Sequence, residues 1–203
     1  MNVDSFIARW FREHVYPVAA DLLLALSSPG SEVCIGLAVT MAALFLLWKR
    51  AWYALLTLML VVPGGTLLGE LLKLAVQRIR PFVEGPQGPW GGYSFPSSHT
   101  LAATLLYGLV ALCVLRIPRC QPWRACSCVA AGAVVIGVGF SRVALGAHYL
   151  SDVMASLVLG TGWLVLCVTL VGALQRRRIR VAAVVLSCPT PELPLNTAIE
   201  QSS

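Results

Sequence analysis

Long apolar runs separated by short polar junctions dominate this chain of 203 residues. Runs of this length are typical of membrane-spanning helices, which require about 20 predominantly apolar residues. The pattern predicts about five spans, which cover residues 33–48, 51–76, 101–117, 125–140 and 151–174. Pro63, Gly64 and Gly65 interrupt the second of them. We therefore expect this helix to kink or to admit a neighbouring helix closely.

The regions outside the spans carry different patterns. Within residues 1–30, apolar side chains recur every three or four positions among charged ones, which predicts an amphipathic segment at the membrane surface. The apolar run 18–26 has about half the length of a span, so we expect it to be half-inserted or to lie on the surface. Residues 85–96 are dense in Gly and Pro and are predicted to form a loop. Residues 179–203 are predicted to be a cytoplasmic, disordered tail.

The composition agrees with a membrane protein, and the basic residues give it an orientation. Hydrophobic residues make up 58% of the chain and charged residues 12%, whereas soluble domains carry roughly 25% charged residues. Basic residues concentrate in cytoplasmic loops. Nine of the fifteen Lys and Arg lie in three groups between or after the apolar runs: Lys49 and Arg50; Arg116, Arg119 and Arg124; and Arg176, Arg177, Arg178 and Arg180.

With these groups in the cytoplasm, segments 77–98 and 141–150 both face the exterior, on the same side of the membrane. The net charge of +6 then reflects membrane orientation, and we expect no nucleic-acid partner. The predicted fold is an all-α, polytopic helical bundle over residues 31–178, preceded by the amphipathic segment.

Three polar side chains follow the fourth apolar run within a short stretch. They are the guanidinium of Arg142, the imidazole of His148 and the carboxylate of Asp152. If the chain is helical there, His148 and Asp152 share a face, because they lie four residues apart. The carboxylate can then accept the proton of one ring nitrogen and leave the other bare, as an oriented nucleophile or base. Arg142 is a planar cation suited to phosphate oxygens.

Two more polar groups lie at the outer ends of the spans. Lys73 and Arg80 share a face if the second helix persists to Pro81. Alternatively, these two cations snorkel to the lipid head groups, a role that we assign to Arg78.

Pro96-Ser97-Ser98-His99 opens the third span, where unpaired helix amides can bind an anion. Ser97 can cap the helix and donate to a phosphate, and His99 can protonate a departing oxygen. The alternative is a purely structural capping serine near a histidine.

Together, the three pieces are Lys-x6-Arg-Pro, Pro-Ser-Ser-His and Ser-Arg-x5-His-x3-Asp, in this order over residues 73–152. They resemble the three-part signature of the type 2 phosphatidic acid phosphatase (PAP2) superfamily, which includes bacterial membrane lipid phosphatases and, more distantly, vanadium haloperoxidases. One departure is Ser98, where many members have Gly.

The resemblance implies a role for each motif residue. His148 would attack phosphorus and form a phosphohistidine, Asp152 would hold its ring, and His99 would protonate the leaving lipid oxygen. The phosphoryl oxygens would be bound by Lys73, Arg80, Arg142, Ser97 and the amide of Ser98. Three fixed cations can stabilise the transferred group without a metal or another cofactor, so we expect neither.

The predicted function is that of an integral membrane lipid phosphatase at the outer, periplasmic face of a bacterial inner membrane. The small size and the short loop between the first two motifs are similar to those of undecaprenyl diphosphate phosphatases. Alternatives are a phosphatidylglycerophosphate, phosphatidate or lipid A phosphatase. A non-catalytic lipid-binding or transport protein is the alternative from another class. The oligomeric state is left open.

Overall fold

The structure, a computed structural model, describes residues 3–82, 84–85, 88–117 and 121–187. Contacts divide the chain into two units, residues 1–171 and 172–203, and the bundle described below is the first unit. The elements are α1 (Val3–His14), α2 (Tyr16–Ser27), the short 3-10 helix η1 (Ser28–Gly30), α3 (Glu32–Trp48), α4 (Trp52–Val76), β1 (Glu84–Gly85), β2 (Gly88–Pro89), α5 (Ser98–Leu115), α6 (Gln121–Ala144) and α7 (Leu150–Ser187).

Among the described residues, five helical stretches are long and apolar enough to cross a membrane: Ala19–Trp48, Trp52–Val76, Ser98–Leu115, Trp123–Ala144 and Leu150–Arg180. The prediction of an all-α bundle with about five spans is therefore confirmed. The first span differs from the prediction, because it begins at Ala19 and includes most of the run 18–26, which we expected to be half-inserted or to lie on the surface. The reason is that η1 joins α2 to α3 through a single tight turn, so the two helices form one stretch of span length.

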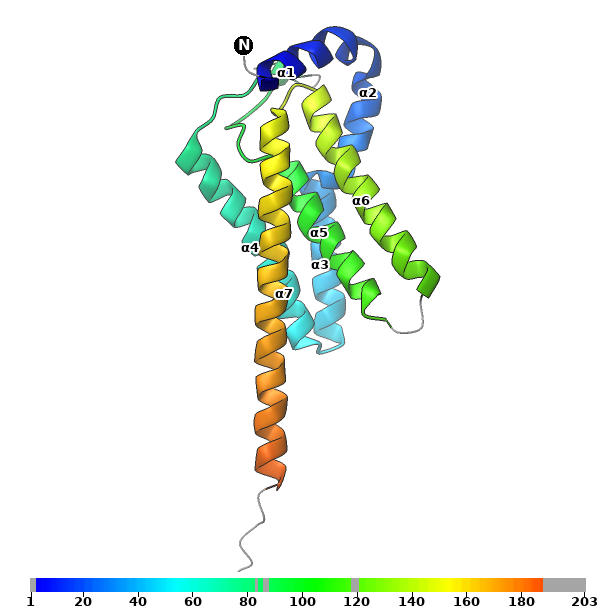
Figure 1. Cartoon of the computed structure of the whole chain (residues 1–203), viewed down its shortest axis with the longest axis vertical. Coiled ribbons are helices and arrows are strands. Elements are labelled where there is room, and N and C mark those ends of the chain that lie inside the picture. The colour runs from blue at the N-terminus through cyan, green and yellow to red at the C-terminus, as the bar shows by residue number, and fades with distance from the viewer. Residues whose placement is uncertain (1–2, 83, 86–87, 118–120, 188–203) are drawn as a thin grey trace, which may run out of the picture. The chain divides into compact units, whose positions relative to one another are not determined.

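Helix α5 is the centre of the bundle and packs most extensively against α6 and α4 (Figure 1). Glycines in α4 permit the close approach that the sequence predicted. A Cβ on Gly65 would lie 2.6 Å from Cδ1 of Leu105, and one on Gly69 would lie 2.5 Å from Cδ2 of Leu101. These contacts hold the start of α5 against α4, and the start of α5 carries Ser97, Ser98 and His99.

Helix α4 ends where the predicted span 51–76 ends, whereas α7 continues beyond its predicted end. Helix α4 stops at Val76, because Gln77 adopts the left-handed conformation (φ 51°, ψ 35°) and caps it. The helix therefore does not persist to Pro81, and Lys73 and Arg80 do not share a helix face. Helix α7 continues to Ser187, so the expected disorder is wrong for residues 179–187. The rest of the expected tail, residues 188–203, lies outside the described residues.

The predicted loop joins α4 to α5 and contains, within its described residues, only the two-residue antiparallel pair of β1 and β2. It lies at the same end of the bundle as α1 and the turn between α6 and α7 (Figure 1). Gly146 closes this turn with φ +72°, and a Cβ there would lie 2.6 Å from Phe82. The two outer segments predicted from the basic residues therefore do lie together.

Candidate active site

His148 lies in the turn before α7 and is only 2% exposed. Its Nδ1 is 2.6 Å from the backbone carbonyl oxygen of Ser94. A carbonyl can only accept a hydrogen bond, so Nδ1 carries the proton and Nε2 is unprotonated. Burial lowers the pKa of His148 to about 4, so the ring is neutral at pH 7. A neutral imidazole with a bare nitrogen can act as a nucleophile.

Asp152 is fully buried in the first turn of α7. Its Oδ2 is 3.8 Å from Nδ1 of His148, which is too long for a hydrogen bond. The expected direct bond between the two side chains is therefore wrong. Instead, Oδ2 accepts hydrogen bonds from the amide of Tyr149 at 2.9 Å and from the hydroxyl of Ser94. Ser94 thus contacts both groups, because its hydroxyl holds the carboxylate while its carbonyl orients the ring.

Arg78 lies against Asp152 and not among lipid head groups, so the role that we assigned to it is wrong. Its NH1 is 2.6 Å from Oδ1 of Asp152, and its NH2 is 2.9 Å from Oδ2 of Asp4 in α1. The guanidinium also lies over the ring of Tyr149, 4.2 Å from its centroid. The sequence contained a signal for this role, since Arg78 is a third cation inside the eight-residue stretch from Lys73 to Arg80.

Arg80 lies in the extended segment after α4 and reaches the nucleophile. Its NH1 is 3.3 Å from Nε2 of His148 and donates to the carbonyl of Ala147 at 2.9 Å. Its Nε and NH2 donate to the carbonyls of Gly91 and Gly92. These backbone carbonyls fix the guanidinium beside the bare nitrogen.

Arg142, at the end of α6, is 5% exposed. Its NH1 donates to Ser27 at 3.2 Å, and its guanidinium lies 4.7 Å from the ring centroid of Trp90. Among the described residues, Arg142 Nε and Trp90 Nε1 are both buried donors without an acceptor. A buried donor without an acceptor costs free energy, and an anion bound here would satisfy these groups. The motifs did not indicate Trp90, whose place depends on the path of the loop.

Lys73, in the last turn of α4, contacts the start of α5. Its Nζ lies 2.8 Å from a carboxylate oxygen of Glu70 and donates to the hydroxyl of Ser98. Ser98 in turn donates to Glu70 at 3.1 Å. The side chain of Ser98 thus links the first motif to the second.

Ser97 and His99 complete the site. Ser97 occupies the N-cap position of α5, but its side chain makes no capping bond. It accepts a hydrogen bond from Thr100 at 3.1 Å, and its amide donates to Ser156 at 2.9 Å. His99 lies within electrostatic range of four motif side chains, which are those of Arg142, His148, Lys73 and Arg80. The structure therefore brings all three motifs together.

The family model of the PAP2 superfamily matches residues 50–176, which make up most of the bundle. The chain is 31% identical over 131 residues to phosphatidylglycerophosphatase B of Bacillus subtilis (strain 168), which covers 64% of each protein. It is 35% identical over 140 residues to lipid A 1-phosphatase of Rhizobium etli, over 64% of this chain and 53% of the relative. The chain thus spans about half to two thirds of the length of these curated relatives.

Two solved structures share the fold. The crystal structure of a transmembrane PAP2 type phosphatidylglycerolphosphate phosphatase from Bacillus subtilis matches with a TM-score of 0.70 and 24% identity, over 86% of this chain and 85% of that one. The crystal structure of Aquifex aeolicus LpxE matches with a TM-score of 0.62 and 18% identity, over 83% of this chain and 96% of that one. At these identities the likeness shows the fold alone.

Proposed function

The chain belongs to the PAP2 superfamily, and we propose that it is a membrane lipid phosphatase that works through a phosphohistidine on His148. The observation that carries this proposal is the state of the His148 ring. Its Nδ1 is bound to the carbonyl of Ser94, and its bare Nε2 lies 3.3 Å from the guanidinium of Arg80. A binding protein would require the cations but not an oriented, neutral imidazole.

The first step forms a bond between Nε2 of His148 and phosphorus and breaks the bond from phosphorus to the lipid oxygen. His99 donates a proton to that leaving oxygen. Lys73, Arg80 and Arg142 bind the phosphoryl oxygens, whose charge must be stabilised in the transition state.

The second step returns the enzyme to its starting state. A water molecule attacks phosphorus and gives up a proton to His99, and the bond from phosphorus to Nε2 breaks. Inorganic phosphate leaves, and His148 is again a neutral ring with its proton on Nδ1.

The substrate is a lipid phosphate whose tail stays among the helices while the head group enters the charged end. The names of the curated relatives favour a monophosphate on a glycerol or sugar lipid, because they refer to phosphatidylglycerophosphate and lipid A. Undecaprenyl diphosphate, which the sequence resemblance placed first, and phosphatidate are the competing substrates.

We place the active end at the periplasmic face of a bacterial inner membrane. The cytoplasmic assignment of the basic groups supports this orientation. Lys49 and Arg50 lie in the turn between α3 and α4, and Arg116 follows the last residue of α5. This turn and the C-terminal end of α5 lie at the end of the bundle opposite α1 (Figure 1).

Phosphate release from a panel of lipid phosphates in detergent tests the proposal. The panel contains phosphatidylglycerophosphate, phosphatidate, lipid A and undecaprenyl diphosphate, each assayed with and without EDTA. We expect release from at least one lipid, unchanged by EDTA and abolished in His148→Ala. The matched control is His14→Ala, which removes an exposed histidine in α1 and should retain full activity. Binding of a lipid phosphate without any release would identify a lipid-binding or transport protein instead.

A further inference from the structure

Two carboxylates from distant parts of the chain share the guanidinium of Arg78. Asp152 lies in α7 and is completely buried, whereas Asp4 lies in α1 and its side chain is 22% exposed. Each terminal nitrogen of Arg78 bonds to one of them, NH1 to Asp152 at 2.6 Å and NH2 to Asp4 at 2.9 Å. Charge-assisted bonds of this kind are among the strongest hydrogen bonds in proteins. Arg78 therefore bridges the amphipathic helix and the buried carboxylate beside His148.

Helix α1 is attached to the active end through its polar side chains. Asp4 also accepts hydrogen bonds from the amide of Ser151, at 3.2 Å, and from its hydroxyl. Burial alone would raise the pKa of the Asp4 carboxyl, but the bonds from Ser151 and Arg78 hold it below its usual value. Further along α1, Arg12 donates to the carbonyl of Glu84 at 3.2 Å. The helix is thus tied to α7 and to the loop that holds the motifs.

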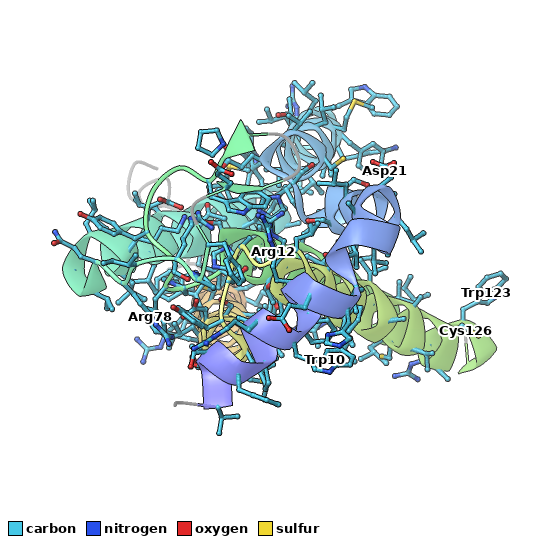
Figure 2. The ribbon with its side chains drawn as sticks, turned by 90° about the horizontal axis from the view of Figure 1, so that it is seen from above. Trp10, Arg12, Asp21, Arg78, Trp123 and Cys126 are labelled. Atoms are coloured by element: carbon cyan, nitrogen blue, oxygen red, sulfur yellow. The ribbon has the colours of Figure 1, made fainter. Side chains whose placement is uncertain are left out.

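The apolar side of α1 contacts α6 through Phe11, whose ring centroid lies 5.5 Å from that of Phe140. A cavity of about 610 Å³ also lies between α1, α6 and α7, lined on the α1 side by Phe6, Ile7, Trp10 and Phe11. Figure 2 shows α1 crossing above the bundle, with Arg12 and Arg78 on one side of the helix and Trp10 on the other. The position of α1 therefore depends on both apolar packing and polar bonds, and among the polar bonds the one to Arg78 reaches the active site.

We propose that Arg78 and Asp4 are positioning residues of the active site, so that the docking of α1 holds Asp152 and, through Ser94, the ring of His148. The proposal rests on the phosphatase function proposed above. Arg78 fixes Oδ1 of Asp152, which leaves Oδ2 aimed at Ser94 and Tyr149. Asp4 helps to keep the 32% exposed side chain of Arg78 in this position, because it bonds to NH2 while Ser151 accepts a bond from NH1 at 2.7 Å.

This arrangement separates Arg78 from the phosphate ligands. Its two terminal nitrogens already bond to carboxylates, so it contributes to the orientation of the nucleophile and not to binding of the head group. Its loss should therefore lower kcat and leave KM nearly unchanged, because the interaction lost is one that matters in the transition state. Loss of Arg80, which lies beside Nε2 and is proposed to bind the phosphoryl oxygens, should instead raise KM as well as lower kcat.

The experiment compares kcat and KM of the full-length variants Arg78→Gln, Arg78→Lys, Asp4→Asn and the Arg78→Gln, Asp4→Asn double variant with the wild type. We expect kcat of Arg78→Gln to fall by about tenfold or more with KM within about twofold, and Arg78→Lys to recover part of the loss. Asp4→Asn should lower kcat less. Its effect should be smaller in the Arg78→Gln background than in the wild type, because part of it is transmitted through Arg78 and the two effects are then not additive. Arg9→Gln, an exposed arginine in the same helix, is the matched control and should keep the wild-type kcat.

Several outcomes would overturn the inference. One is an unchanged kcat in Arg78→Gln or a rise in KM alone, and another is an additive effect of the two substitutions. If Arg78→Gln fails to fold, as judged by its unfolding midpoint in detergent, Asp4→Asn decides, and an unchanged kcat there refutes the coupling to α1. If the wild type releases phosphate and His148→Ala does not, the proposed function holds. Variants of Arg78 and Asp4 that lack the expected changes in kcat then contradict this inference only. If the wild type releases none, the proposed function fails and the inference falls with it.

Discussion

His148 is a buried imidazole that stays neutral where a free one would begin to take up a proton. Burial lowers its pKa to about 4, and the charges of Arg142 and Arg80 act in the same direction, while Asp152 opposes them. An unfolded chain has the ordinary histidine pKa of about 6.5. Between these two values the unfolded state binds more protons than the folded state.

The first prediction concerns this difference, which makes the folded state less stable as the pH falls from about 6.5 to about 4. We expect the thermal unfolding midpoint of the wild type in detergent to decrease across this range. His148→Gln should flatten the decrease, because the substituted side chain does not titrate. If the midpoint of His148→Gln decreases with falling pH as steeply as that of the wild type, another group is responsible for the decrease.

At this scale, the motif residues could be predicted but their partners could not. Lys73, Arg80 and His148 stand at fixed spacings in short stretches, and spacing is visible in a sequence. Ser94 and Asp4 bond to groups that lie 54 and 74 positions away. Such contacts depend on the path of a loop and on where α1 docks, and hydrophobic periodicity encodes neither.

Among the helices, the packing of α4 against α5 and α7 determines where the first motif meets the second. Gly65 is a point of close approach to both α5 and α7. A Cβ there would lie 2.6 Å from Cδ1 of Leu105 and 2.8 Å from Cδ1 of Trp163. Leu105 is completely buried and cannot swing aside, and the indole of Trp163 is held by a 2.9 Å bond to the carbonyl of Leu60.

We therefore predict that Gly65→Ala destabilises the bundle by about 1–3 kcal/mol, the usual cost of overpacking a core. A lower unfolding midpoint in detergent would measure this loss. The same substitution at Gly36 is the control, because a Cβ there meets nothing within 4 Å. Gly36→Ala should leave the midpoint unchanged or raise it. Equal effects at the two positions would contradict the role of Gly65 in packing.

The number and order of the helices could be predicted from the sequence, but some of their ends could not. Apolar runs of span length are a strong signal, and the kink or close approach expected near Pro63 appears as the contact at Gly65. By contrast, Gln77 ends α4 in a left-handed conformation that glutamine rarely adopts. Helix α7 passes through the arginine cluster because arginine is a good helix former, so a change from apolar to charged residues does not end it.

In the whole bundle, all groups proposed to act on phosphate gather at one end. They come from α4, the following loop, α5, α6 and the turn before α7, and Arg78 adds α1 to this set. Segments distant in sequence meet because each span returns the chain to the same two ends. The basic groups that predicted this co-location also support the proposed orientation, in which the opposite end of the bundle faces the cytoplasm.

The orientation can be tested by the access of a thiol reagent. Glu84 lies in the loop at the active end and Lys49 in the turn at the other end, and both side chains are exposed. The seven native cysteines are first replaced, and Glu84→Cys or Lys49→Cys is then introduced alone. A maleimide that cannot cross membranes should label Glu84→Cys in spheroplasts, but Lys49→Cys only after permeabilisation. The reverse pattern would place the active end in the cytoplasm, and the lipid phosphate would then have to be supplied from the inner leaflet.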